Sequence, residues 1–175
     1  MVTIRRARPA DADAMARVHL AAWRSTYAGV LPEGYLTSLS AAHESLGYER
    51  AILERRGGHA GFVAIADGQE IQGGGVVGFI TGGISRRPTI AEGEVETLYL
   101  LDDFRERGIG RRLMRAMASH LASLGAESAF AWVLQDNPAR WFYARLGARL
   151  AAREEMIFAG QRTTQLAYAL SLIHI

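Results

Sequence analysis

Segments in which apolar residues alternate with polar ones, or run together over a few positions, recur along the whole chain and predict β-strands. The expected strands are residues 2–8, 61–66, 76–84, 94–101, 127–134, 148–158 and 163–170. Turn residues at 67–69 join the second strand to the third, and Ala159 with Gly160 joins the last two, so two hairpins are expected. Because no helix follows the glycines at 73–75, they indicate a connection or bulge rather than a phosphate loop.

Between the strands, apolar residues recur every three to four positions, which predicts amphipathic helices. The expected helices run from Asp11 to near Gly29, over 41–56, from Gly110 through Leu113 to Gly125, and from Asn137 to Gly147. Asp11 and Asn137 are candidate N-caps, and Pro138 suits the first helical position. The order of strands and helices is that of an α/β protein with one mixed sheet, and its 175 residues are expected to form a single domain.

Composition excludes several classes of chemistry. There is no cysteine, so disulfides, thiolate metal sites and cysteine nucleophiles are ruled out. All 20 basic residues are arginine, which removes lysine Schiff bases and the P-loop lysine. The five histidines lack metal-ligand spacing, so surface or helix positions without a metal are expected for them.

Charge and hydropathy bear on partners and location. The net charge is only +2 and the arginines are interspersed with acids, so no nucleic-acid partner is expected. No apolar run approaches the roughly 20 residues that span a bilayer, and the N-terminus lacks the apolar core of a signal peptide. A cytoplasmic protein without membrane contact is therefore expected.

The most informative stretch is the strand 94–101 with the loop and helix that follow it. Arg105, Gly108 and Gly110 stand directly before the helix, where free N–H groups and the helix dipole favour phosphate. The glycines leave room for a pyrophosphate to approach the main chain. Two common motifs fail here, since a P-loop needs lysine after the last glycine and a dinucleotide fingerprint needs a third glycine where Leu113 stands.

Read as a whole, Arg-x-x-Gly-x-Gly after a strand ending in Leu-Tyr-Leu resembles the acetyl-CoA motif of the GCN5-related N-acetyltransferases (GNAT). Further along, Asn137-Pro-Ala-Arg-Trp-Phe-Tyr143-Ala-Arg-Leu-Gly resembles the second signature of that family. A weaker likeness extends over 22–32. The resemblance implies the GNAT acyl-CoA acyltransferase fold, a single mixed, mostly antiparallel twisted sheet with helices on both faces, and acetyl-CoA as co-substrate.

The resemblance also implies which residues hold the cofactor. In the family, main-chain N–H groups of the glycine loop hold the pyrophosphate, and two neighbouring strands separate so that the pantetheine arm can pair with one of them. The carboxylate of Glu106 would repel a phosphate at this loop, unless it points to solvent or pairs with an arginine. The cofactor-binding residues implied in this chain are Leu98, Leu100, Arg105, Glu106, Arg107, Gly108, Ile109, Gly110, Arg111, Asn137, Arg140 and Tyr143.

Catalysis requires a base for the ammonium, a donor for the oxyanion and an acid for the thiolate. By resemblance, Tyr143 is the acid and a main-chain N–H near Leu98 is the oxyanion donor. Glu94 lies where several family members place a base, and Glu96 is expected on the same face of the strand because side chains alternate. Glu94 is favoured as base over Glu96. The alternative for Tyr143 is that it is an aromatic side chain packed on an amphipathic helix. The alternative for the two glutamates is that they lie at a solvent-exposed strand end.

The predicted function is acetyl transfer from acetyl-CoA to a primary amine of a small molecule, peptide or protein, directly, since no cysteine can hold the acyl group. The alternatives are a non-catalytic acyl-CoA sensor on the same fold and a protein that binds ATP or NAD. Trp23 and Tyr27 either pack beneath a connection or form a wall of the acceptor pocket. Strand edges and the apolar segment 166–175 suggest a homodimer.

Overall fold

Seven strands form one sheet in the order β1-β2-β3-β4-β5-β7-β6 in the computed structural model, which describes residues 1–68 and 75–175. Only β4 and β5 run parallel, and every other neighbouring pair is antiparallel. This confirms the expected mixed, mostly antiparallel sheet. The strands are β1 (Val2–Arg6), β2 (Ala60–Ala66), β3 (Val76–Ile84), β4 (Gly93–Leu100), β5 (Ser128–Leu134), β6 (Arg149–Phe158) and β7 (Gln161–Ser171).

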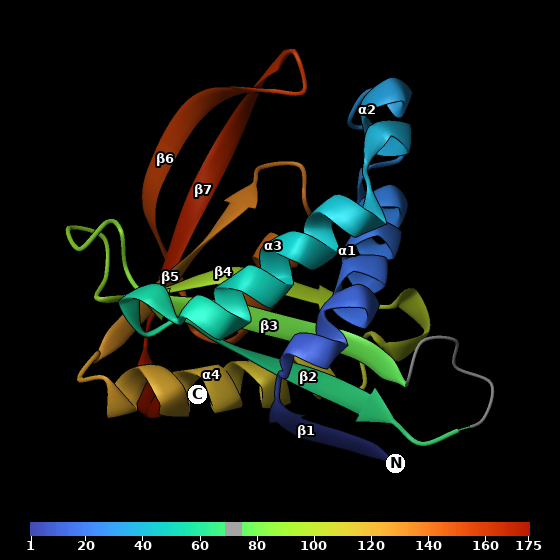
Figure 1. Ribbon diagram of the computed structural model, residues 1–175. Coiled ribbons are helices and arrows are strands. Elements are labelled where there is room, and N and C mark those ends of the chain that lie inside the picture. Colours follow the sequence, from blue (N-terminus) through green and yellow to red (C-terminus); the bar gives the residue numbers. More distant parts are fainter. Residues whose placement is uncertain (69–74) are drawn as a thin grey trace.

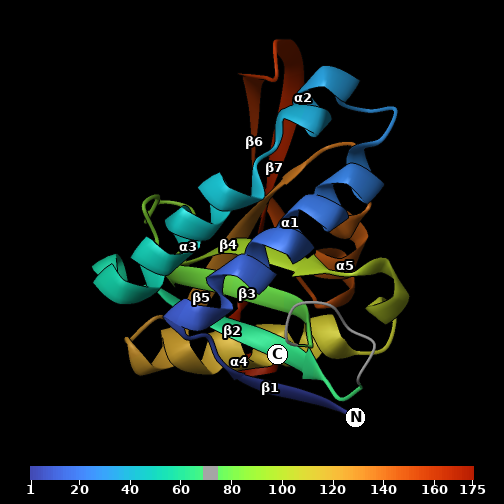
Figure 2. The same ribbon diagram turned by 45° about the vertical axis from the view of Figure 1, so that its right-hand side comes forward.

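Helices cover both faces of this sheet, as expected (Figure 1). The α-helices are α1 (Ala12–Tyr27), α2 (Glu33–Ser38), α3 (Ala41–Glu54), α4 (Ile109–Ser123) and α5 (Ala139–Arg145). Short 3-10 turns are η1 (Pro9–Asp11), η2 (Arg56–Gly58), η3 (Asp102–Phe104) and η4 (Leu172–His174). Figure 2 shows α1 and α3 on one side of the sheet, with α4 on the other and α5 beside the loop between β4 and α4. The short helix α2 lay within the segment of irregular aromatic spacing and was not predicted.

Two clusters of buried side chains hold the helices on the sheet. On one face, α4 buries an apolar stripe that includes Leu113 and Met117 against Val77 and Ile80 of β3. On the other face, Met15 of α1 packs with strand residues of β2 and β3. Each such side chain contributes about 1.5–3 kcal/mol when fully buried. The central strands are therefore fixed from both sides, which makes them a rigid support for a site at their ends.

The strands β4 and β5 separate after a short stretch of pairing. They pair only at Gly93 with Ala129, Glu94 with Phe130 and Val95 with Ala131. Beyond Val95, β4 continues along β3 while β5 continues along β7, and the β6–β7 hairpin stands out from the rest of the sheet (Figure 1). The separation of two neighbouring strands expected from the resemblance is thus present.

Helix starts were predicted to within one residue, but the cap side chains act differently. Asp11 is the N-cap residue of α1, yet its carboxylate accepts hydrogen bonds from the Arg5 guanidinium at 2.8 Å and from the Arg8 N–H at 2.7 Å. The N-cap residue of α5 is Pro138 rather than Asn137. Asn137 still serves the first turn, because its Oδ1 accepts the N–H of Ala139 at 2.8 Å.

The C-terminal strand β7 lies inside the sheet rather than at its edge. β7 lies between β5 and β6, so both of its edges are paired, and the edge strands are β1 and β6. The homodimer suggested by strand edges and the apolar segment 166–175 stays a prediction. Of the predicted turn at 67–69 and the glycines at 73–75, residues 69, 73 and 74 lie outside the described residues. Within 1–68 and 75–175, no helix has the length and apolar character needed to cross a membrane.

Candidate active site

A cavity of about 220 Å³ opens where β4 and β5 separate. It is lined from α1, β4, β5, α5, β6 and β7, so segments far apart in the sequence meet there. The predicted site residues that line it are Trp23, Tyr27, Glu96, Leu98, Asn137 and Tyr143. The structure therefore brings together residues that two separate motifs and the aromatic segment had suggested.

Glu94, which was favoured as the base, does not line this cavity. Its side chain is only 5% exposed and is paired with Arg86, whose Nη2 donates to Oε1 at 2.8 Å. The main-chain N–H and Nε of Arg86 both donate to Oε2 at 3.3 Å. Glu94 thus anchors the β3–β4 connection and is already the acceptor of three hydrogen bonds.

Glu96 lines the cavity, and its side chain is 35% exposed. Its Oε2 lies 3.3 Å from Nε2 of His59, a side chain that is 10% exposed and stands just before β2. The hydrogen bond from His59 holds the pKa of Glu96 below its ordinary value; burial opposes this, and the charges of His59 and Arg86 add to it. Glu96 therefore remains a carboxylate to lower pH than a free glutamate would.

A β-bulge interrupts the pairing of β4 with β3 at Glu96. Thr97 pairs with Thr81 of β3, but the next pair is Val95 with Gly82, so Glu96 has no partner residue in β3. The strict alternation assumed for the strand is interrupted at this residue. Glu94, by contrast, is paired with Gly83 of β3, so the two glutamates differ in their place in the ladder.

Tyr143 of α5 lines the same cavity as Glu96. It is 4% exposed, and burial raises the pKa of its phenol above the ordinary value, with the nearby Tyr99 adding to the effect. The hydroxyl is therefore protonated throughout the neutral range, as a proton donor must be.

The main chain of β4 has free hydrogen-bonding groups on the side of the gap. Leu101 donates its N–H to Val77 of β3 at 2.9 Å. Main-chain groups of successive strand residues point to opposite neighbours, so those of Leu98 and Leu100 point to the side from which β5 has departed. Amide groups of an extended molecule could pair there as an additional strand would.

The glycine loop leads into α4 through two residues with positive φ. Glu106 has φ +59° and Gly108, the N-cap residue, has φ +74°. Glu106 is exposed, which meets the condition under which an acid is compatible with phosphate here. Arg105 is committed to internal contacts, since it donates to Thr26 of α1 at 3.3 Å and pairs with Asp102 at 3.0 Å. The N–H groups of the first turn of α4, rather than the Arg105 side chain, are therefore the candidate donors to an anion at this loop.

The other predicted loop residues differ in their surroundings. Ile109 is buried in the core, and Arg111 is exposed. Arg107 places its guanidinium 5.4 Å from the Phe104 ring centroid. Gly110 is close to Phe142 of α5, because a Cβ there would lie 3.2 Å from Cε2 of that ring. Gly110 thus allows α4 and α5 to approach each other, a packing role in addition to any contact with phosphate.

Asn137 uses its side chain to join α5 to α1. Its Nδ2 donates to the hydroxyl of Tyr27 at 2.9 Å, while burial raises the pKa of Tyr27 to about 12. Arg140 lies over the Trp141 ring, 4.6 Å from its centroid. The second motif therefore supplies one side chain that fixes local structure and one cation on the surface of α5.

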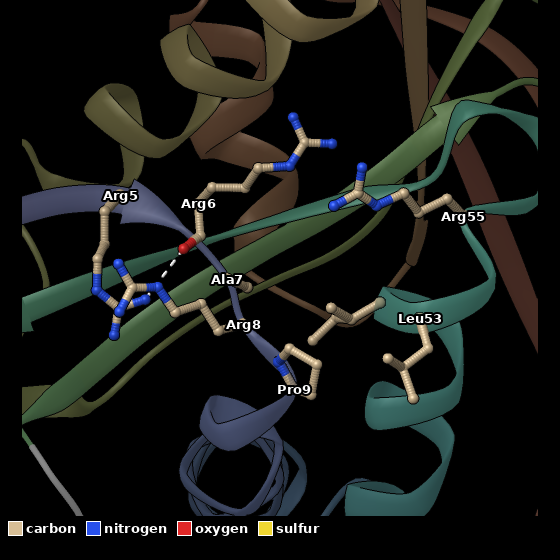
Figure 3. Close-up of a pocket in the computed structure, with 8 residues that line it drawn as sticks. Arg5, Arg6, Ala7, Arg8, Pro9, Leu53 and Arg55 are labelled. Carbon is tan, nitrogen blue, oxygen red and sulfur yellow. Dashed lines mark hydrogen bonds between the residues drawn. The ribbon is translucent and has the colours of Figure 1, made fainter.

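A larger cavity, of about 620 Å³, lies elsewhere, beside the edge strand β1 and the end of α3 (Figure 3). Arginines surround it, and the guanidinium groups of Arg6 and Arg55 point toward each other. None of the predicted site residues lines it. The cavity between β4 and β5 is therefore the candidate active site.

Residues 20–148 match the family described as acetyltransferase (GNAT). The chain belongs to this family. It is 31% identical over 167 residues to the uncharacterized N-acetyltransferase YuaI of Bacillus subtilis (strain 168), covering 95% of this chain and 91% of YuaI. The expected family and the enzyme class, an acetyl-CoA-dependent N-acetyltransferase, are thereby confirmed.

Solved structures of related enzymes share the fold. The PaiA N-acetyltransferase of Thermoplasma acidophilum, in complex with coenzyme A, has a TM-score of 0.73 at 20% identity, covering 95% of this acetyltransferase and 98% of that chain. The acetyltransferase yncA of Salmonella typhimurium, with acetyl-CoA, has a TM-score of 0.69 at 18% identity, covering 98% and 94%.

Several residues of the site had no signal in the sequence. His59 was expected on a surface or a helix, but it is buried beside Glu96, so that interpretation was wrong for this histidine. Tyr99, Trp132 and Phe158 also line the cavity. They come from three different strands, and only the sheet order brings them together. A motif search along the chain cannot detect such contacts.

Proposed function

We propose that this acetyltransferase moves the acetyl group of acetyl-CoA directly to a primary amine held between β4 and β5, with Glu96 as base and Tyr143 as acid. The observation that carries the proposal is that Glu96 and Tyr143 line one cavity at the point where these strands separate. Direct transfer follows from the absence of cysteine in the sequence, because no thiol can accept the acyl group.

The donor would be held along β4 and at the start of α4. The main-chain groups of Leu98 and Leu100 are oriented toward the gap and suit the amides of the pantetheine arm. The N–H groups between Arg105 and Arg111 suit the pyrophosphate, because Gly108 turns the chain into α4 with positive φ. Asn137 and Arg140 would lie beside the arm, and Asn137 also supports the first turn of α5. Acetyl-CoA supplies the activated thioester.

The proton transfers follow from the two side chains. Glu96 accepts a proton from the substrate ammonium, and the free amine nitrogen forms a bond to the acetyl carbon as the carbon–sulfur bond breaks. Tyr143 gives its proton to the departing sulfur, whose thiol has a pKa of about 8.5 by analogy with cysteine. The acylated nitrogen then loses its second proton, which restores the Tyr143 phenol, and Glu96 releases the first proton to solvent. A main-chain N–H near Leu98 stabilises the charge on the acetyl oxygen. Acid–base assistance of this kind contributes roughly 10²–10⁴-fold in rate.

Two measurements test this function. In a thermal-shift panel, acetyl-CoA and CoA should stabilise the protein more than ATP or NAD; stabilisation by ATP or NAD alone would contradict the proposal. With acetyl-CoA and a panel of primary amines, thiol release should be observed. A protein that binds acetyl-CoA yet releases no thiol with any amine would be the non-catalytic sensor.

The role of Tyr143 is tested within the same assay. Tyr143→Phe should lower kcat by about 10²-fold or more while leaving the Kd for CoA nearly unchanged, because only the proton donor is lost. Tyr168→Phe, a change of the same kind on β7, should leave both unchanged. An unaffected rate in Tyr143→Phe would remove this residue from the mechanism.

The cytoplasm as location and a homodimer as assembly remain predictions of the sequence. The strand edges open to a second copy are those of β1 and β6. Sedimentation of the purified protein measures the assembly directly.

A further inference from the structure

The cavity between β4 and β5 is lined mainly by apolar and aromatic residues and by few charged ones. Among the described residues that line it, Glu96 is the only one with a formal charge. The remainder are mainly apolar or aromatic, with the rings supplied by Trp23, Tyr27, Tyr99, Trp132, Tyr143 and Phe158. Whatever amine approaches the acetyl group therefore meets one carboxylate and several ring faces.

The aromatic wall is formed by rings that already support one another. Trp23 of α1 lies with its centroid 4.7 Å from Tyr27 and 5.7 Å from Phe158, which comes from β6 on the other side of the gap. Tyr35 of α2 packs on Phe158 at 5.2 Å. Because these contacts exist within the chain itself, the wall is in place before an acceptor binds, which reduces the entropy lost on binding.

The size of the cavity limits the acceptor. A volume of about 220 Å³ is below the roughly 300–1,000 Å³ of sites that take drug-sized ligands. Part of this space must also admit the acetyl end of the donor, beside Leu98 and Tyr143. A small amine therefore fits within the cavity, whereas only one end of a large polycyclic or oligosaccharide amine could enter it.

The charges exclude further classes. Aromatic faces and Glu96 all attract a cation and repel an anion. Arg86 pairs with Glu94 and Arg87 pairs with Glu154, and none of these four residues lines the cavity. An acceptor carboxylate would therefore be desolvated without a partner, and a second ammonium would find no second acid.

From these observations we infer that the acceptor is a small primary amine with a single positive charge and an apolar carbon frame that lies against the aromatic wall. This inference rests on the proposed acetyl transfer and adds the class of its acceptor. Glu96 receives the ammonium, and the Trp23 and Phe158 rings receive the apolar frame.

Matched pairs of amines test the inference by thiol release from acetyl-CoA. Phenylalanine differs from 2-phenylethylamine by a carboxylate, and 1,5-diaminopentane differs from pentylamine by a second ammonium. We expect kcat/KM to be higher for the monocation in each pair, by more than about tenfold. Higher values for phenylalanine or for the diamine would overturn the inference while leaving acetyl transfer intact. An absence of thiol release with every amine, despite binding of acetyl-CoA, would instead contradict the proposed function.

Variants of the wall give a second, independent reading. Phe158→Ala should raise KM for 2-phenylethylamine by about tenfold and leave KM for acetyl-CoA unchanged. Ile157→Ala, at the adjacent residue of β6 with 75% exposure, should change neither constant. If Phe158→Ala does not fold, Phe158→Leu keeps an apolar side chain and should raise KM for 2-phenylethylamine more than for pentylamine. An unchanged KM for 2-phenylethylamine in the folded Phe158 variant would overturn the inference.

Discussion

The contact between Glu96 and His59 should control how the activity of the site depends on pH. The pKa of Glu96 is lowered first by the hydrogen bond from His59, and burial partly opposes this effect. A carboxyl with a lowered pKa stabilises the folded state above its unfolded pKa, and this contribution is lost as the pH falls through the folded value. The same shift keeps Glu96 ionised, and so able to accept a proton, to lower pH.

Removing the histidine should therefore move the activity profile. We expect His59→Ala to raise the pKa of Glu96, so the acid limb of kcat/KM shifts to higher pH and the activity just above the limb falls. His59→Gln, which keeps an N–H donor, should restore the limb in part. The exposed His174→Ala serves as control. A pH profile of kcat/KM decides the matter: an unmoved acid limb in His59→Ala would mean that Glu96 is not the titrating base or that His59 does not act on it.

The sequence did not reveal which of Glu94 and Glu96 lines the cavity. Because side chains alternate along a strand, both carboxylates were predicted on one face. No residue type in the sequence indicates the bulge that leaves Glu96 without a partner in β3. The contact with His59 joins residues far apart in the chain. By contrast, the resemblance of the α5 segment to a family motif singled out Tyr143, and the structure has it at the cavity, while its role as acid stays a prediction.

Among the elements, the strand–loop–helix from β4 to α4 was predicted closely, because glycines and apolar spacing mark its boundaries. The local pattern did not predict which other element each helix or strand contacts. Gly110 was interpreted as a gap for phosphate, yet in the structure its missing side chain also admits the ring of Phe142. The two motifs are thus in direct contact, so a change in one can act through the other.

This contact allows the packing role of Gly110 to be separated from its cofactor role. Gly110→Val would press on Phe142 and should lower the free energy of unfolding by about 1–3 kcal/mol. It should also weaken CoA binding. In the double variant Gly110→Val with Phe142→Ala, we expect stability to recover in part and CoA affinity to remain low. Denaturant unfolding and calorimetric titration with CoA measure the two quantities.

The control for this experiment is Gly47→Val, because a Cβ at Gly47 of α3 meets nothing within 4 Å. It carries the same change in helix propensity without the contact. If the double variant recovers CoA affinity together with stability, the glycine serves packing alone and the loop does not approach the phosphates at this residue.

For the whole molecule, element order and fold class were predictable, whereas the order of strands in the sheet was not. Hairpins 61–66 with 76–84 and 148–158 with 163–170 follow from adjacent segments joined by turns. The insertion of β7 between β5 and β6, and the parallel pairing of β4 with β5, join distant segments. Only the resemblance to a family implied the separation of β4 from β5, since no local pattern encodes the end of a pairing.

The short pairing between β4 and β5 raises the question whether the two parts of the sheet unfold together. One core cluster spans both parts, because Leu113 and Met117 of α4 pack with Val77 of β3 and with Ala129 and Ala131 of β5. We therefore predict a single domain that unfolds in one transition, with equal calorimetric and van't Hoff enthalpies. Acetyl-CoA at a hundredfold excess over its Kd should add about 2.7 kcal/mol. For a chain of this size, that corresponds to a rise in Tm of roughly 5–11 °C. Scanning calorimetry with and without acetyl-CoA measures both effects, and ATP serves as the control ligand. Two separate transitions, only one of them sensitive to acetyl-CoA, would contradict the prediction. They would show that the two parts of the sheet unfold independently and that the ligand binds one of them alone.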